Sequence, residues 1–218
     1  MILEGKNITK SYSDLQVLKG IDLQIKKGEI VSVVGASGAG KSTLLHILGA
    51  LDIPDSGDIL LKGKNLFKMN NSQMARFRNQ NIGFVFQYHN LLPEFTALEN
   101  VCIPGYIAGK PNEQVEKEAA RILRLLGLED RMEHKPSEMS GGELQRTAVA
   151  RALVNAPEIV FADEPSGNLD SKNAGELHEL FFQLREKLNQ TFVIVTHNQQ
   201  LAGMADRTLE IKDGMIVK

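Results

Sequence analysis

The stretch that decides the fold is Gly35-Ala36-Ser37-Gly38-Ala39-Gly40-Lys41-Ser42-Thr43. It fits the pattern G-x-x-x-x-G-K-[ST], and we call it the phosphate loop. An apolar, β-branched strand is predicted before it over 29–34, and a helix after it over 42–51. Glycines allow successive N–H groups to point at phosphate oxygens, and the helix N-terminus adds positive charge. A glycine-rich turn is the alternative, but this position between strand and helix favours a nucleotide site.

A magnesium-nucleotide site needs more than the loop. Lys41 is placed to reach the β- and γ-phosphates, and the Ser42 hydroxyl to bind Mg²⁺. A second Mg²⁺ contact is expected from the end of a buried strand, and Asp163 follows the apolar run 159–162. Glu164, the next residue, can accept a proton from an attacking water. The alternative is a solvated acidic turn, which Asp-Glu-Pro would more often be in isolation.

The order of predicted elements indicates an α/β fold. Short strands and glycines fill the first third, and alternating residues at 21–25 predict a sheet edge or hairpin. From about 96 to 155 helical signals dominate, including a capping box at Thr96 and a helix from Pro111 to Leu126. Strand, helix and strand at 159–162, 171–188 and 192–195 then restore the alternation of a parallel sheet. A helical insertion therefore interrupts an α/β core.

Composition limits the classes of partner. The chain has 218 residues with 25 Lys and Arg against 27 Asp and Glu, a net charge of −2. This balance does not favour a general nucleic-acid binder. The single cysteine, Cys102, cannot form an internal disulfide, which fits a reducing compartment. No apolar stretch approaches the ~20 residues of a membrane span, so we expect a chain that neither crosses a membrane nor is secreted.

The run Ser140-Gly141-Gly142-Glu143-Leu144-Gln145-Arg146 narrows the class of nucleotide-binding protein. Ser140 and Glu143 form a capping box ahead of an apolar helix, which by itself needs no ligand. Such a helix start also exposes N–H groups that can bind phosphate. The run resembles the signature motif of ATP-binding cassette (ABC) ATPases, Leu-Ser-Gly-Gly-Gln, with Met139 and Glu143 at its ends.

Other residues follow in the order that this family shows. Tyr12 stands where the family has an aromatic ring stacked on adenine, although alone it would read as ordinary packing. Gln87 follows the predicted strand 82–86, as does the family's glutamine that contacts Mg²⁺ and the attacking water. Asp170 ends the run Ser166-Gly167-Asn168-Leu169-Asp170, which resembles the loop joining two active sites but alone reads as a helix cap. His197 stands where the family has a histidine on the γ-phosphate; alone, it could be a loop histidine.

The resemblance spans residues 12–197 and carries definite expectations. It implies a P-loop NTPase core with an antiparallel β subdomain and an inserted helical subdomain over about 88–157, all within one domain, 1–218. It implies ATP and Mg²⁺ as cofactors and a head-to-tail, ATP-dependent dimer with a second copy. The implied roles are catalysis by Glu164, His197 and Gln87, Mg²⁺ binding by Ser42, Gln87 and Asp163, and ATP contacts by Tyr12, residues 35–43, Ser140, Gly142 and Asp170.

Residues 86–101 lie where ABC transporters receive their membrane subunits. The stretch Leu91-Leu92-Pro93-Glu94-Phe95-Thr96-Ala97-Leu98-Glu99-Asn100 is similar to that of ATPases from bacterial lipoprotein-releasing systems, the LolD type. From its residues alone, the stretch could equally be a hinge that packs against its own subdomain. The resemblance implies integral membrane permease partners, a peripheral place on the cytoplasmic side of the inner membrane, and no direct contact with the lipoprotein.

The branch also contains macrolide-exporter and FtsE ATPases, which are the first alternatives. Tyr88, Asn90, Leu144 and Ser166 depart from residues more usual in it. These departures bear on the transported substrate, because none of them removes a catalytic group. A DNA-acting ABC ATPase usually needs a long insertion before the signature, and the interval after Gln87 is short. A P-loop kinase is the last rival, and it would phosphorylate an acceptor instead of releasing phosphate.

Overall fold

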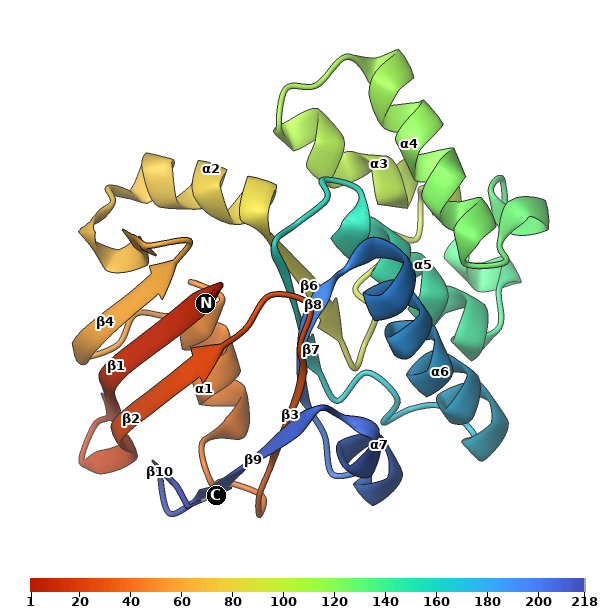
Figure 1. Cartoon of the computed structure of the whole chain (residues 1–218). Coiled ribbons are helices and arrows are strands. Elements are labelled where there is room, and N and C mark those ends of the chain that lie inside the picture. The colour runs from red at the N-terminus through yellow and green to blue at the C-terminus, as the bar shows by residue number, and fades with distance from the viewer. Residues whose placement is uncertain (218) are drawn as a thin grey trace.

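A six-stranded sheet forms the centre of the molecule (Figure 1). The computed structural model describes residues 1–217. The strand order is β10-β9-β3-β8-β7-β6, and every pair is parallel except β10 with β9. The bounds are β3 Ile30–Val34, β6 Ile82–Phe86, β7 Ile159–Asp163, β8 Thr191–Val195, β9 Arg207–Lys212 and β10 Met215–Ile216. The expected α/β core is confirmed.

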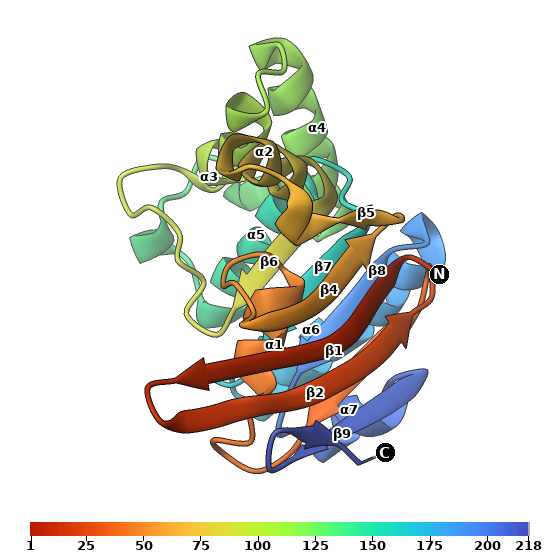
Figure 2. The ribbon, with the colours of Figure 1, turned by 90° about the vertical axis from the view of Figure 1, so that its left-hand side faces the viewer.

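A second, antiparallel sheet carries the N-terminal part of the chain, seen nearest the viewer in Figure 2. Its order is β2-β1-β4-β5, and all its pairs are antiparallel. The bounds are β1 Leu3–Tyr12, β2 Leu15–Ile25, β4 Ser56–Leu61 and β5 Lys64–Asn65. This sheet is the expected antiparallel part of the fold.

Helix α1, Lys41–Leu48, lies between the two sheets and follows the phosphate loop directly. The sequence predicted that it runs to Leu51, but it ends three residues earlier. Gly49 caps it, donating its N–H to Leu45 O at 3.0 Å, and Ala50 turns the chain with φ +55°. That left-handed residue cannot continue an α-helix, which explains the early end.

Three helices and two short 3₁₀ turns lie between β6 and β7 in the chain (Figure 1). The helices are α3 Ala97–Ile107, α4 Asn112–Leu125 and α5 Gly141–Leu153, and the turns are Glu129–Arg131 and Pro136–Glu138. The capping box at Thr96 is present, and Gly127, with φ +70°, follows the end of α4 as predicted. Pro111 is the cap of α4 and not its first helical residue.

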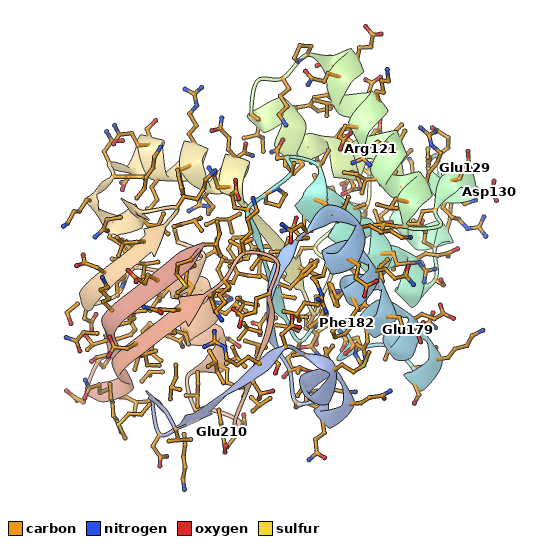
Figure 3. The ribbon with its side chains drawn as sticks, in the orientation of Figure 1. Arg121, Glu129, Asp130, Glu179, Phe182 and Glu210 are labelled. Carbon is orange, nitrogen blue, oxygen red and sulfur yellow. The ribbon has the colours of Figure 1, made fainter. Side chains whose placement is uncertain are left out.

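The parallel sheet is buried on both faces, as its continuous apolar strands require. Val31 and Val193 pack with α1 and the antiparallel sheet, whereas Ile30 and Phe192 face the helices on the other side. Those helices include α6 Ser171–Leu188, while α7 Gln199–Met204 packs against β3 and α2 Asn71–Asn81 against β6. Figure 3 shows the labelled charged side chains at the outside. No helix within residues 1–217 is both long and apolar enough to span a bilayer.

Candidate functional site

Four neighbouring strand ends bring the candidate residues to one edge of the sheet. Strands β3, β8, β7 and β6 are adjacent and parallel, so their carboxyl ends lie together. The phosphate loop begins after β3, Gln87 follows β6, Asp163 ends β7, and His197 comes two residues after β8. In open parallel sheets this edge is where ligands bind.

Two positions of the phosphate loop require glycine. Gly35 has φ +149°, and a Cβ there would lie 2.2 Å from the carbonyl oxygen of Ile211. Gly40, the residue before α1, has φ +101°, and its Cβ would lie 2.9 Å from a methyl carbon of Leu18. Lys41 Nζ donates to the carbonyl oxygens of Gly35 and Ala36 at 3.0 and 2.9 Å. The Lys41 ammonium therefore lies against the backbone of the phosphate loop, where phosphate binding is expected.

Ser42 and Asp163 meet, as a shared Mg²⁺ site requires. Ser42 Oγ donates to Asp163 Oδ1 at 3.0 Å, and His46 Nε2 lies 3.8 Å from Oδ2. Burial raises the pKa of Asp163, an effect opposed by the hydrogen bond from Ser42. A hydroxyl and a carboxylate are the hard oxygen ligands that Mg²⁺ prefers. Residues 1–217 contain no cluster of three or more His, Cys, Asp or Glu that could hold a metal.

Glu164 and His197 are brought together beside this pair. Glu164 has φ +46°, and its N–H donates to the carbonyl oxygen of Val195 at 3.0 Å. Its Oε2 lies 2.8 Å from His197 Nδ1 and accepts the backbone N–H of His197 at 3.3 Å. The carboxylate is only 20% exposed, whereas the imidazole is 74% exposed. The candidate base is thus held in place while its histidine partner faces outward.

The Gln87 side chain pairs with Asn168 in the loop that follows β7. Its Nε2 donates to Asn168 Oδ1 at 3.0 Å, and Asn168 Nδ2 donates back to the carbonyl oxygen of Gln87 at 3.3 Å. A Cβ on Gly167 would lie 2.9 Å from the same amide nitrogen. This amide pairing joins Gln87 to the loop 166–170.

Tyr12 is held by Asp52, a residue that was not predicted from the sequence. Its hydroxyl donates to Asp52 Oδ2, and this hydrogen bond is the main cause of its raised pKa. Lys10 Nζ donates to Asp52 Oδ1 at 2.9 Å and lies 5.0 Å from the centre of the Tyr12 ring. The side chain of Thr43, the last residue of the phosphate loop, acts in the opposite direction and lowers the pKa of Tyr12. The half-exposed ring therefore lies near the loop with a cation on one face.

The signature helix starts as predicted. Ser140 caps α5, and Glu143 accepts both its backbone N–H and its hydroxyl at 2.8 Å. Arg131 Nε donates to the other carboxylate oxygen of Glu143 at 2.7 Å. The backbone N–H of Ser140, its hydroxyl and Arg131 together lower the pKa of Glu143 to about 2. The capping interpretation is correct: the Ser140 N–H and hydroxyl are engaged with Glu143, and Gly141 and Gly142 follow as the first residues of the helix.

Asn173 bonds to Asp170 of the loop 166–170 and lies close to Gly142 of the signature, a proximity that no sequence signal indicated. Asp170 caps α6 and accepts from the N–H and the side-chain amide of Asn173 at 2.9 and 2.6 Å. A Cβ on Gly142 would lie 2.4 Å from Asn173 Oδ1, so a larger residue at 142 would require the Asn173 side chain to move. Within residues 1–217, no hydrogen bond or ion pair joins Ser140 or Gly142 to the phosphate loop of this chain.

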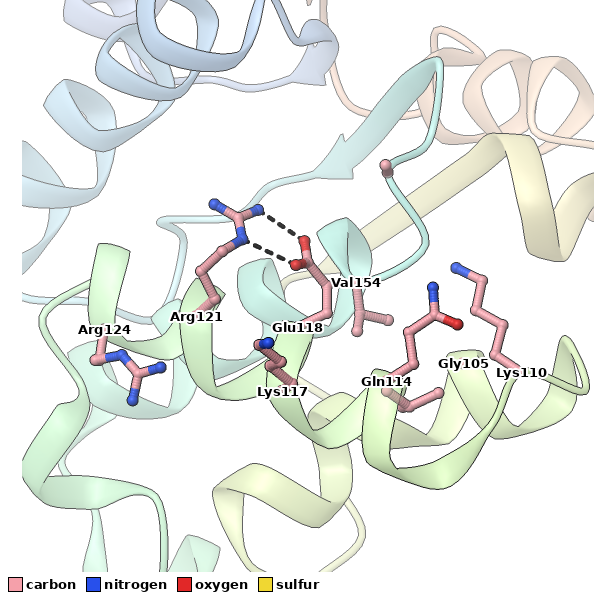
Figure 4. Close-up of a pocket in the computed structure, with 10 residues that line it drawn as sticks. Gly105, Lys110, Gln114, Lys117, Glu118, Arg121, Arg124 and Val154 are labelled. Carbon is pink, nitrogen blue, oxygen red and sulfur yellow. Dashed lines mark hydrogen bonds and ion pairs between the residues drawn. The ribbon is translucent and has the colours of Figure 1, made fainter.

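Two cavities differ in their relation to this site. One of about 780 Å³ is lined by Gly35–Ala39 together with residues of β2 and the β9–β10 turn. Another, of about 380 Å³, lies against α4 (Figure 4). Lys110, Lys117 and Arg124 line it, and its Arg121 pairs with both oxygens of Glu118 at 2.9 and 2.7 Å. None of the predicted site residues lines this second cavity.

Comparison with known families agrees with this arrangement. The family model described as ABC transporter matches residues 18–167, which include the phosphate loop, the signature and the β7 carboxylates. The chain therefore belongs to the ABC transporter family. It carries the ATP-binding cassette of that family, with the P-loop fold that its strand order already indicated.

Individual relatives cover nearly the whole chain. The lipoprotein-releasing system ATP-binding protein LolD of Bacteroides fragilis (strain YCH46) is 59% identical over 215 residues, 99% of each protein. The dimeric structure of MJ0796, a bacterial ABC transporter cassette, matches with a TM-score of 0.90 and 39% identity over 100% of this chain and 97% of that one. A post-hydrolysis dimer of MJ0796 holds ADP and Pi and matches with the same score, identity and coverage.

Proposed function

We propose that this chain is the ATP-hydrolysing subunit of an ABC complex that releases lipoproteins from the bacterial inner membrane. The observation that carries the proposal is its 59% identity to LolD along 99% of both chains, which includes the segment after β6. ATPases of this branch share their catalytic motifs, so similarity confined to those motifs would not favour one transported substrate. Similarity along 99% of both chains, by contrast, favours lipoproteins as the transported substrate.

The site supports hydrolysis by direct attack of water on ATP. Lys41 neutralises charge on the terminal phosphates, and the Tyr12 face away from Lys10 stacks on adenine. Ser42 and Asp163 would hold Mg²⁺, which neutralises charge on the phosphate oxygens when it is bound. Glu164 accepts the proton of the attacking water as the water oxygen bonds to the γ-phosphorus and the bond from that phosphorus to the bridging oxygen breaks, which releases ADP and phosphate. His197, which holds Glu164 Oε2, contacts the γ-phosphate from its exposed position.

A second copy of the chain completes each site. Gly142 has its N–H at a helix start, and the Ser140 hydroxyl, which donates to Glu143, can turn to a phosphate. Within residues 1–217 neither residue is joined to the phosphate loop of its own chain by a hydrogen bond or ion pair. In a head-to-tail dimer they bind the γ-phosphate held by the partner's phosphate loop, and Asp170 lies at the junction of the two sites. Two ATP molecules then hold the dimer closed, and hydrolysis with phosphate release opens it.

The membrane partner docks on the helical subdomain, residues 88–157, next to Gln87. Leu92 and Phe95 expose 44% and 41% of their surface in the segment that precedes α3. Buried Asn100 fixes this segment through hydrogen bonds to Leu92, Phe95 and Thr96. Exposed apolar side chains on an ordered loop suit contact with an integral membrane permease. The chain thus acts from the cytoplasmic side of the inner membrane and contacts neither nucleic acid nor the lipoprotein.

Depletion of the protein tests this function. We expect lipoproteins destined for the outer membrane to remain in the inner membrane, and re-expression of the unaltered chain to restore their release. A chain carrying Glu164→Gln should be made at the same level and fail to restore it. Normal lipoprotein sorting, with a defect in cell division or in drug export, would instead favour the FtsE-like or macrolide-exporter-like alternatives. The membrane protein that co-purifies would then identify the complex.

A further inference from the structure

Two side chains of the signature helix hold the backbone on either side of Gln87. Gln145, in the second turn of α5, is 1% exposed, and its Nε2 donates to the carbonyl oxygen of Phe86 at 3.0 Å. Phe86 is the last residue of β6 and the immediate neighbour of Gln87. This bond fixes the point at which the Gln87 segment leaves the sheet.

Arg151, near the other end of α5, holds the far side of the segment. Its two terminal nitrogens donate to the carbonyl oxygens of His89 and Asn90, both at 2.6 Å. Asn90 has φ +50°, so the chain turns sharply where the guanidinium holds it. Two charge-assisted bonds from one planar group fix orientation as well as position.

The same helix begins at Ser140 and Gly142, whose proposed ligand is the partner's ATP. A rigid helix of 13 residues therefore connects that nucleotide to both anchors of Gln87. In the structure the Gln87 amide is paired with Asn168 and not with Asp163. Any displacement of α5 on dimer closure is passed to the Gln87 backbone, because the anchors leave the segment little freedom of its own.

We propose that Gln145 and Arg151 are positioning residues that couple the signature helix to Gln87, so that the partner's ATP at Ser140 sets where Gln87 stands in this chain's own site. The proposal rests on the function proposed above, since it requires Gln87 to act in hydrolysis. Neither positioning residue touches nucleotide. They act only by fixing the carbonyl groups of Phe86, His89 and Asn90.

Kinetics of the purified full-length chain test the coupling. Arg151→Met and Gln145→Met keep side-chain length but remove the donors. We expect each to lower kcat about tenfold while KM for ATP changes less than about twofold, because misplacing a catalytic group affects turnover more than binding. Arg151→Lys, which keeps a charged donor, should recover part of the loss. Arg124→Met on the exposed face of α4 is the matched control and should turn over normally.

A double-mutant cycle separates positioning from general damage. If Arg151 and Gln145 act through Gln87, then adding either substitution to Gln87→Ala should lower kcat no further. A double variant whose loss of kcat is the product of the two single losses would overturn the proposal. Normal turnover in both Arg151→Met and Gln145→Met would also overturn it. If Arg151→Met fails to fold, Gln145→Met and Arg151→Lys give the same test. If Gln87→Ala turns over ATP normally, the catalytic role proposed for Gln87 is wrong, and this inference is wrong with it. If Gln87→Ala loses turnover while Arg151→Met and Gln145→Met do not, only the coupling is refuted.

Discussion

Glu164 Oε2 lies 2.8 Å from His197 Nδ1 and also accepts the backbone N–H of His197, so one carboxylate oxygen is held twice by the turn after β8. The strained φ of +46° at Glu164 aims the side chain toward that turn. These two contacts fix the position of the carboxylate. This arrangement supports the role proposed for Glu164, because a base that is already held in place accepts a proton without first reorganising.

Glu164→Gln tests that role. The amide has the size of the carboxylate and can still contact His197, but it cannot accept the proton. We expect kcat for ATP to fall by about 10²-fold or more, with ATP affinity nearly unchanged. An ATP-bound dimer should accumulate and be visible by gel filtration with ATP present. Turnover at the normal rate would remove Glu164 as the base.

The elements that position this site were largely predictable, because each carries a local signal. The strands β3, β6, β7 and β8 are short apolar runs. The residues just before α3, α5 and α6 are good helix caps: Thr96, Ser140 and Asp170. The length of β1 was not predicted. Its alternation is broken by shifts of register, one of them around Asn7 with φ +48°.

The contacts between motifs were not predictable from the sequence. Asp52 and Asn173 are ordinary polar residues until the fold brings them to Tyr12 and Gly142. Likewise, nothing local indicates that Gln145 contacts the end of β6, 59 residues earlier in the chain. Motifs identify the groups that carry chemistry, whereas the residues that orient those groups are found only through tertiary structure.

The Tyr12 ring gives a prediction about nucleotide selectivity. Tyr12→Ala removes the stacking surface, so we expect ATP affinity to fall by about tenfold, the loss of about 1–2 kcal/mol that stacking on an aromatic ring contributes. Tyr12→Phe is the matched control, since it keeps the ring and loses only the bond to Asp52. If stacking alone recognises the base, GTP should also be hydrolysed measurably. Absolute selectivity for ATP would contradict recognition by stacking.

Glu143 gives a prediction about acid stability. Its pKa in the folded protein is about 2, below the ordinary value of 4.5. A depressed folded pKa stabilises the protein at pH above about 4.5, and this contribution is lost as the pH falls through about 2. We expect Glu143→Gln, which can still cap α5 but loses the ion pair with Arg131, to lower the free energy of unfolding by about 1 kcal/mol at pH 7.

Urea denaturation at a series of pH values measures this effect. The difference between Glu143→Gln and the unaltered protein should shrink steadily below about pH 4.5. Arg131→Met provides the control, because combining it with Glu143→Gln should cost less than the two single losses together. A difference that stays constant down to pH 2 would show that the carboxylate charge does not stabilise the fold.

Asn100 gives the last prediction, which concerns the proposed docking segment. Its side chain is fully buried, donates to the carbonyl oxygens of Leu92, Phe95 and Thr96 at 3.0 to 3.1 Å, and accepts the N–H of Leu92 at 2.8 Å. Asn100→Leu leaves these backbone groups without their partner. We expect the free energy of unfolding to fall by about 2–4 kcal/mol, as measured by denaturant titration.

The same substitution separates docking from nucleotide binding. Asn100 holds the backbone that presents Leu92 and Phe95, whereas the phosphate loop lies on another element and depends on different contacts. Membrane-partner capture by the Asn100→Leu protein should therefore decrease at a temperature where it remains folded, while its ATP affinity stays within about twofold. Asn112→Leu, at the exposed start of α4, should change stability by less than about 0.5 kcal/mol. Unchanged capture by a folded Asn100→Leu protein would place the docking surface elsewhere than on the segment before α3.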